Sequence, residues 1–258
     1  MRRPATAPLV RSEIYGHEGP DLDDPAELFH EASKLHPALA RRQAAGIVRL
    51  ETNDALRAAA THPVRRNPLR PTLPLPRPSR PACTLWSAIA RRRSRRSFRG
   101  SITDGELATL LDAAYGMRGG GRRTVPSGGA LYPLELYVAQ RRRGVHRYDP
   151  ELHRLEEHDA DDPWPALVLT SPLPSLLDDA TAVLLVLAVF GRTRFKYGQR
   201  GYRFALLEAG HVVQNVVLAA AALDVVALPF GGYYDARIDE IVGADGVDES
   251  VVYAVVLG

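Results

Sequence analysis

The segment from Tyr202 to Leu223 constrains the fold of this 258-residue chain more than any other. Its pattern predicts one long helix whose second half is apolar on nearly every side. A helix that is hydrophobic all round is buried, so it must lie in a core or against another chain. The spacing of Glu208, His211 and Asn215 puts them on one face, with Gln214 beside them. Buried polar groups need partners, which could be a cofactor, a second subunit or other core groups.

Apolar runs on either side of this helix predict a sheet. Strands are expected at residues 134–140, 181–190, 225–232 and 250–258, with a hairpin formed by 145–149 and 153–158. Further helices are expected at residues 25–34, 38–46, 85–94, 106–116, 163–169 and 235–242. Helices and strands do not alternate regularly, which favours an α+β fold with a central sheet flanked by helices.

The chain divides into two predicted parts. Residues 1–82 form an N-terminal helical segment followed by a proline-rich strap, and residues 83–258 form the main domain. Seven of the 20 prolines fall between Pro63 and Pro81, so that segment must be extended. It could be a linker, but the regular spacing of Leu69, Leu73 and Leu75 favours a strap over the main domain.

Composition excludes several classes of protein. Cys83 is the one cysteine, so no internal disulfide or cysteine-rich zinc site is expected. No second histidine lies at metal-ligand spacing from His211, so no metal site is expected. No membrane-spanning segment or signal peptide is predicted, which favours a cytoplasmic protein. The net charge is +3 and the arginines are clustered. They could be solvated surface or hold an anionic ligand, and too few aromatics lie among them to predict nucleic-acid binding.

Four motifs point to a ligand. The arginines and serines of RRRSRRSF (residues 91–98) could hold a phosphate, because guanidinium forks match phosphate oxygens. The glycines of PSGGALYPLE (residues 126–135) would let the backbone approach a flat ligand, although the same residues are also typical of an ordinary turn. Gly231 and Gly232 stand at the end of a predicted strand. Lys196, one of only two lysines, stands next to Tyr197, and such a pair could act as a proton acceptor.

Taken in order, these motifs resemble the FMN-dependent nitroreductases, and more narrowly their SagB-type azoline dehydrogenase branch. The resemblance runs from about residue 84 to residue 258, and FHEASKLHP (residues 29–37) is also similar to that branch. PSGGALYPLE is the most specific match, and LLEAGHVVQNVVLAAAAL resembles the family helix. One departure is Asp224 after the long helix, where relatives tend to have glycine. Relatives also carry a basic residue near the C-terminus that is absent here, so Arg123 or Arg203 would substitute at the phosphate.

The resemblance implies a nitroreductase-like fold, FMN as the cofactor, and an intertwined homodimer with the long helix in its core. It assigns Lys196 and Tyr197 to catalysis. The residues that it assigns to FMN are Arg92, Arg93, Ser94, Arg96, Pro126, Ser127, Gly128, Gly129, Leu131, Gln214, Gly231 and Gly232. Of these, the segment from Pro126 to Gly129 is expected to reach the flavin of the other subunit.

The implied activity is oxidation of a thiazoline or oxazoline to a thiazole or oxazole in a ribosomally made peptide. A proton leaves the α-carbon of the ring and a hydride passes to flavin N5. The partners would be the modified precursor peptide and a cyclodehydratase complex. Two alternatives remain open: an NAD(P)H-dependent nitroreductase or flavin reductase, and a non-catalytic scaffold that binds peptide. The sequence does not distinguish which of Lys196 and Tyr197 is the base, or what the first 80 residues do.

Overall fold

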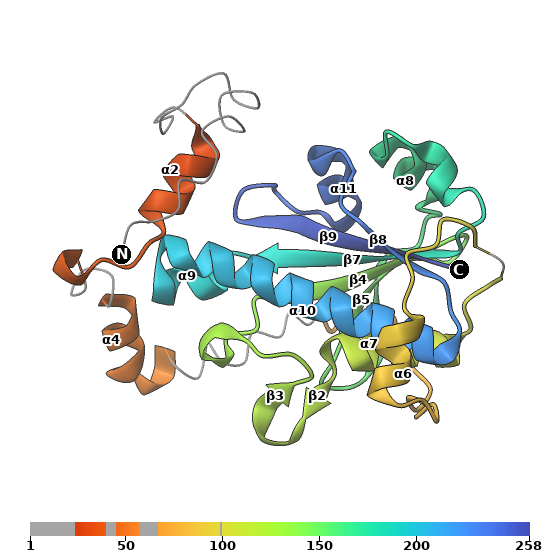
Figure 1. Cartoon of the computed structure of the whole chain (residues 1–258), viewed down its shortest axis with the longest axis horizontal. Helices are drawn as coiled ribbons and strands as arrows, with labels where there is room; N and C mark the ends of the chain where they lie inside the picture. Colours follow the sequence, from red (N-terminus) through yellow and green to blue (C-terminus); the bar gives the residue numbers. More distant parts are fainter. Residues whose placement is uncertain (1–23, 40–44, 57–66, 99) are drawn as a thin grey trace.

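The computed structural model describes residues 24–39, 45–56, 67–98 and 100–258 (Figure 1). A seven-stranded sheet forms its centre, in the order β1-β6-β5-β4-β7-β9-β8, and each strand is antiparallel to its neighbours. The strands are β1 (Thr72–Pro74), β4 (Leu134–Gln140), β5 (Gly144–Asp149), β6 (Arg154–Asp159), β7 (Ala182–Val189), β8 (Ala227–Phe230) and β9 (Glu249–Leu257). A separate hairpin pairs β2 (Met117–Arg118) with β3 (Arg122–Arg123).

Helices cover both faces of this sheet. The long helix α10 (Gln199–Leu223) packs on one face with α7 (Asp104–Tyr115), and α6 (Leu85–Arg91) lies against it. The other face carries α8 (Trp164–Thr170) and α11 (Asp235–Val242). Alternate residues of β7 point to the two faces: Leu184 and Val186 pack with the α10 side, and Leu185 and Leu187 with the α8 side. The buried strand expected at 181–190 is therefore the core of the sheet.

Helix ends follow their predicted signals. Thr103 and Glu106 form a capping box at the start of α7, and the side chain of Asp24 caps α2 (Pro25–Ala32). The second N-terminal helix, predicted at 38–46, is a 3-10 turn at Pro37–Leu39 and a helix α4 at Ala45–Glu51, and residues 40–44 lie outside the described part. The helix predicted at 85–94 ends at Arg91, so most of the arginine motif follows the helix.

The proline-rich segment is extended and pairs with the sheet edge, as a strap would; its residues 63–66 lie outside the described part. Thr72, Leu73 and Pro74 form β1 opposite residues 154–156 of β6. Of the three leucines expected to pack, only Leu75 does so, because Leu69 is 90% exposed and Leu73 44% exposed. The reason is that the strap adds to the edge of the sheet and does not lie across a face.

One helix, α10, bears on the expectation that the chain has no membrane-spanning segment. Among the described residues it is the one helix that passes such a test of length and composition, with a mean hydropathy of 1.5. The core helix of a globular protein passes the same test. Here α10 packs on α7 and on strands of the sheet, and nine of its residues are buried in the chain itself.

Candidate active site

Lys196 and Tyr197, called here the Lys-Tyr pair, lie in the last turn of a short helix α9 (Gly191–Tyr197). This helix directly follows β7 and was not predicted from the sequence. Gly198 then turns the chain into α10 with φ at +58°, a conformation that favours glycine. Thr193 donates a hydrogen bond to the carbonyl of Gly201 at 2.9 Å, which fixes α9 against the first turn of α10. The Lys-Tyr pair therefore lies at the end of a helix whose position is fixed against α10.

The Lys-Tyr pair meets the turn formed by residues 126–133, called here the Ser-Gly-Gly turn. Strands β4 and β7 are antiparallel with Leu134 opposite Ala188, so the chain before β4 and the chain after β7 lie at the same end of the sheet. A methyl group on Gly129 would stand 2.5 Å from Tyr197 Oη and 2.8 Å from Lys196 Nζ. The two most informative sequence motifs thus form one site.

The Ser-Gly-Gly turn has an unusual backbone. Gly129, Ala130 and Tyr132 all have positive φ, at 65°, 53° and 44°. Left-handed conformations of non-glycine residues cost about 1–2 kcal/mol each and persist where the surroundings enforce them. Here the hydroxyl of Ser127 accepts the N–H of Tyr132 at 2.9 Å and closes the turn. Such strained turns cluster at functional sites.

Behind this turn, α10 contributes a buried carboxyl group, Glu208, which is only 2% exposed. Burial raises its pKa to about 7, against the opposing effects of Ser127, Tyr115 and Arg123. Tyr115 Oη donates to Glu208 Oε1 at 2.5 Å, and the same burial raises the pKa of Tyr115 well above its ordinary value. Glu208 Oε2 makes no hydrogen bond of normal geometry with any described residue, although the Ser127 hydroxyl is near enough to lower the pKa.

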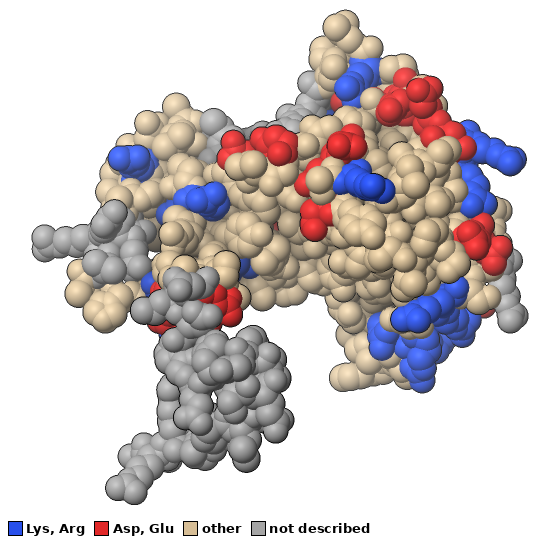
Figure 2. Space-filling view, turned by 90° about the horizontal axis from the view of Figure 1, so that it is seen from above, with Lys and Arg blue, Asp and Glu red and all other residues tan. Residues whose placement is uncertain are grey.

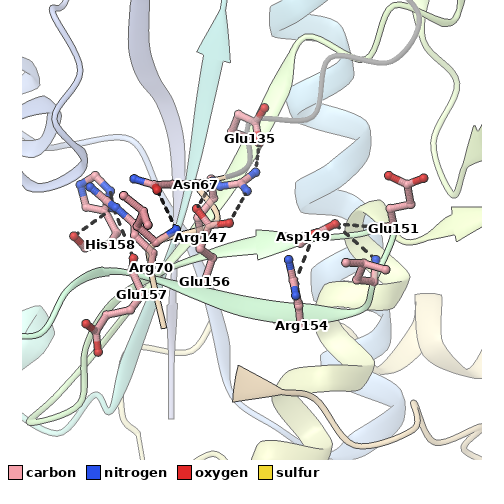
Figure 3. A network of polar contacts seen from close by, with 12 residues as sticks. Asn67, Arg70, Glu135, Arg147, Asp149, Glu151, Arg154, Glu156, Glu157 and His158 are labelled. Atoms are coloured by element: carbon pink, nitrogen blue, oxygen red, sulfur yellow. Dashed lines mark hydrogen bonds and ion pairs between the residues drawn. The ribbon is translucent and has the colours of Figure 1, made fainter. Parts of the chain in front are cut away.

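A buried polar network holds the start of α9 to the sheet. Glu135, the last residue of the PSGGALYPLE motif, accepts from Arg192 of α9 at 2.5 Å and from Arg147 of β5 at 3.2 Å. Arg147 also pairs with Glu156 of β6 at 3.1 Å, and Glu156 accepts the N–H of Asn67 in the strap (Figure 3). Removing one partner from such a buried network leaves an uncompensated charge, which costs about 3–5 kcal/mol. The network therefore fixes the position of α9.

The predicted phosphate-binding arginines lie at the other end of α10. Arg91, Arg93 and Arg95 line a small hollow of about 110 Å³ with Ala220, Ala221 and Asp224. Of the predicted residues only Arg93 lines it; Arg92 caps α6, and Ser94 and Arg96 are exposed. Basic side chains gather on the molecular surface at this end (Figure 2). The hollow offers several guanidinium groups to an anion of phosphate size.

The two groups of predicted residues are far apart within one chain. Gly128 contacts the ring of Phe204 near the start of α10, whereas the arginine hollow borders residues 217–224 near its end. At a rise of about 1.5 Å per residue, they are separated by roughly 20–30 Å along the helix. One chain therefore does not bring its arginine motif and its Ser-Gly-Gly turn to the same small ligand.

The remaining predicted residues are dispersed. Leu131 is fully buried, so only its backbone could face a ligand. Gln214 and His211 are exposed on α10, whereas Glu208 and Asn215 point inward, so the predicted polar face is split. Asn215 donates to the carbonyl of Ala113 at 3.0 Å. Gly231 and Gly232 are exposed beyond β8, whose last residue lies level with the middle of β9.

Several residues that build this site were not assigned to it from the sequence, and Arg123, which was expected at the phosphate, lies here instead. Tyr115, Arg123 and Tyr132 form an aromatic and cationic stack, with the guanidinium of Arg123 lying 4.1 Å from the ring centre of Tyr115. Arg192 and Glu135 anchor α9. A charged residue near the start of an apolar strand is the sequence signal that could have identified Glu135. Within the described residues there is no cluster of three or more potential metal ligands.

Comparisons with known proteins agree on the fold. The family model described as the nitroreductase family matches residues 89–258, which is more than half of the chain. A Methanocaldococcus jannaschii protein, whose name describes it provisionally as a nitroreductase, is 38% identical over 164 residues, covering 61% of this chain and 83% of its own. The Escherichia coli microcin B17-processing protein McbC is 31% identical over 134 residues, covering 48% of this chain and 49% of its own.

A solved structure is similar over nearly the whole chain. It is a chain of the E. coli microcin synthetase McbBCD complex with truncated pro-MccB17 bound. The TM-score is 0.58 at 23% identity, and the match covers 90% of this chain and 91% of that chain. At this identity the similarity supports a shared arrangement of helices and strands.

Proposed function

The chain belongs to the nitroreductase family and has its α+β fold, as expected from the sequence, and from this premise we propose that it is an FMN-dependent azoline dehydrogenase. It would oxidise thiazolines or oxazolines of a ribosomally made peptide to thiazoles or oxazoles. The observation that carries the proposal is the contact of the Lys-Tyr pair with Gly129, because hydride transfer from a nicotinamide needs no such base. Similarity to a microcin-processing protein supports a peptide substrate.

The described residues fit FMN when two chains contribute to each site. The arginine hollow suits the phosphate, and the Ser-Gly-Gly turn, with its exposed Gly129, suits the flat ring. Because the two groups are separated by roughly 20–30 Å along α10, the phosphate and the ring of one FMN would be held by different subunits. This supports the intertwined homodimer expected from the sequence.

The exposed face of α10 also supports a dimer. Leu206 is 40% exposed and Leu207 is 61% exposed, with Gly210 and His211 on the next turn of the same face. A second chain packed on this face would bury these leucines, each contributing about 1.5–3 kcal/mol at full burial. The long helix would then lie in the dimer core.

In the proposed reaction, the residues of this chain orient the ring and take a proton. One ring carbon loses a proton, its neighbour loses a hydride, and the bond between them becomes a double bond. When bound, FMN would supply the two-electron acceptor for the hydride, with dioxygen as the terminal oxidant. Lys196 Nζ and Tyr197 Oη share the face of Gly129, so either can receive the proton while the other stabilises the charge.

The test is the double variant Lys196→Ala with Tyr197→Phe. Azole formation from a thiazoline peptide is followed by mass spectrometry as a decrease in mass of two hydrogens. The double variant is expected to lose this activity with its FMN content unchanged. Lys34→Ala, which removes the chain's other lysine from an exposed pair with Glu31, is the control and keeps full activity. Near-normal turnover of the double variant refutes the assignment. Rapid flavin bleaching by NADPH without azole formation points to a nitroreductase, and peptide binding without FMN points to a scaffold.

A further inference from the structure

A groove lies between the N-terminal helices and the segment that carries the Lys-Tyr pair. Figure 1 shows these elements, α2 and α4, beside α9. One part has a volume of about 440 Å³ and is lined by Ala32, Ser33, Leu35 and Gly46 on one side and by residues 194–200 on the other. A second part of about 570 Å³ is lined by α2 and by Arg194, Gln199 and Tyr202. Both parts border Ala32, Arg194 and Gln199, so they form one elongated groove. Its size is that of a ligand-binding site.

The N-terminal wall of this groove is docked by close backbone contact. A methyl group on Gly46 of α4 would lie 2.3 Å from the carbonyl oxygen of Phe195 and 2.6 Å from that of Lys196. Only glycine permits this approach, because the opposing atoms are backbone and cannot swing away. Helix α4 is thus seated directly on the helix that carries the Lys-Tyr pair.

Helix α2 is anchored next to it by polar and aromatic contacts. Arg203 donates to the carbonyl of His30 at 2.7 Å, and Arg200 donates to that of Ser33 at 3.3 Å. The ring of Phe29 packs edge-on against Tyr202 with ring centres 5.3 Å apart. The N-terminal segment therefore has a defined position beside the proposed catalytic residues.

The lining of the groove is cationic and apolar. Arg194, Lys196 and Arg200 border it together with Leu28, Leu35 and Phe195. No carboxylate borders it among the residues that the structure describes. Arg194 makes no side-chain hydrogen bond or ion pair with any described residue, so its guanidinium is available to a ligand. An extended peptide with apolar and acidic side chains complements these walls.

We propose that this groove binds the part of the substrate peptide that flanks the reacting ring, and that it selects peptides with a carboxylate side chain there. The inference rests on the proposed dehydrogenase function and adds the role of the N-terminal segment to it. The groove reaches the Lys-Tyr pair, so a peptide lying in it would present its ring at Gly129.

The test measures binding to the FMN-loaded protein by fluorescence anisotropy. The probes are two labelled decapeptides with a central thiazole, identical except that one has Glu and the other Gln beside the ring. Because thiazole is the oxidised product, binding is read without turnover. Arg194→Gln is expected to weaken the Glu peptide about fivefold and the Gln peptide hardly at all. The control is Arg142→Gln, at an exposed arginine on the β4–β5 turn, which changes neither affinity.

A second pair of variants tests the wall itself. Gly46→Ala forces α4 away from α9 and is expected to weaken both peptides with FMN content unchanged. Gly105→Ala, where a methyl group meets nothing within 4 Å, is the matched control. The inference is overturned if Arg194→Gln affects both peptides equally, or if the parent protein binds neither. Thiazoline oxidation, followed in parallel, separates the two proposals: turnover without charge-dependent binding removes only the groove, and absent turnover removes the dehydrogenase.

Discussion

Glu208→Gln is the substitution whose effect follows most directly from the structure. Glu208 is 2% exposed and its pKa is raised to about 7, mainly by burial. Glutamine has nearly the same shape and can still accept the hydrogen bond from Tyr115 Oη. Its amide nitrogen would replace the Oε2 atom that makes no normal hydrogen bond with any described residue. The substitution removes the charge and leaves the packing in place.

The sign of the pH effect follows from the direction of the shift. Because the folded pKa of about 7 lies above the ordinary value of 4.5, the native state holds the proton more tightly than the unfolded chain. The stabilisation from the protonated Glu208 carboxyl is complete at pH values below the pKa of the unfolded chain. It is lost as the pH rises through the pKa of the folded protein. The shift corresponds to about 3 kcal/mol in all, of which about 2.5 kcal/mol is lost between about pH 5 and about pH 8.

The measurement is the free energy of unfolding in urea at a fixed protein concentration across this pH range. Relative to the parent protein, Glu208→Gln is expected to gain about 2.5 kcal/mol on going from about pH 5 to about pH 8. Glu240→Gln, at an exposed carboxylate on α11, should follow the parent curve. Parallel curves for Glu208→Gln and the parent protein would refute the conclusion that this carboxyl is proton-bound in the native state near neutrality.

Three further substitutions test other parts of the site. Gly129→Ala is expected to lower azole formation at least tenfold with FMN retained, because its methyl group collides with the Lys-Tyr pair; Gly119→Ala, with nothing within 4 Å, is the control, and equal activity of the two contradicts the contact. Glu135→Gln should lower the free energy of unfolding by about 3 kcal/mol, whereas Asp104→Asn, in an exposed pair with Arg143, should change it by less than about 1 kcal/mol; equal effects would argue against a buried network. Asp224→Gly relieves a left-handed residue with φ at +61° at the end of α10 and is expected to raise the unfolding free energy by about 1 kcal/mol, a result that a fall in Tm would contradict.

The sequence predicts the main elements because their signals are local. The apolar period of α10 and the buried run of β7 leave few alternatives, and the capping box marks the start of α7. Helix α9 was missed because it has only seven residues, mostly basic or aromatic, between a strand and a glycine. Strand β1 was missed because prolines disfavour strands except at sheet edges, where it in fact lies.

The site is predictable in its parts but not in its assembly. The Ser-Gly-Gly turn and the Lys-Tyr pair are recognisable as motifs, yet their contact depends on the register of β4 against β7, which places Leu134 opposite Ala188. The participation of Arg192 and Glu135 likewise depends on tertiary structure. Arg91 and Arg95 border the arginine hollow, whereas the predicted Arg92, Ser94 and Arg96 do not, because α6 ends at Arg91 and the chain leaves the helix there.

The N-terminal segment also protects the edge of the sheet, through strand β1. Without its three paired residues, β6 would be an open edge of the sheet, with backbone groups free to pair with other chains. A chain shortened to begin at residue 83 would therefore expose a template for aggregation. Side chains of α2 and α4 that line the groove could vary, apart from Gly46, but loss of the whole segment would also remove the cover of β6. Peptide selectivity could thus change through side chains of an N-terminal segment that must be kept to protect the edge of the sheet.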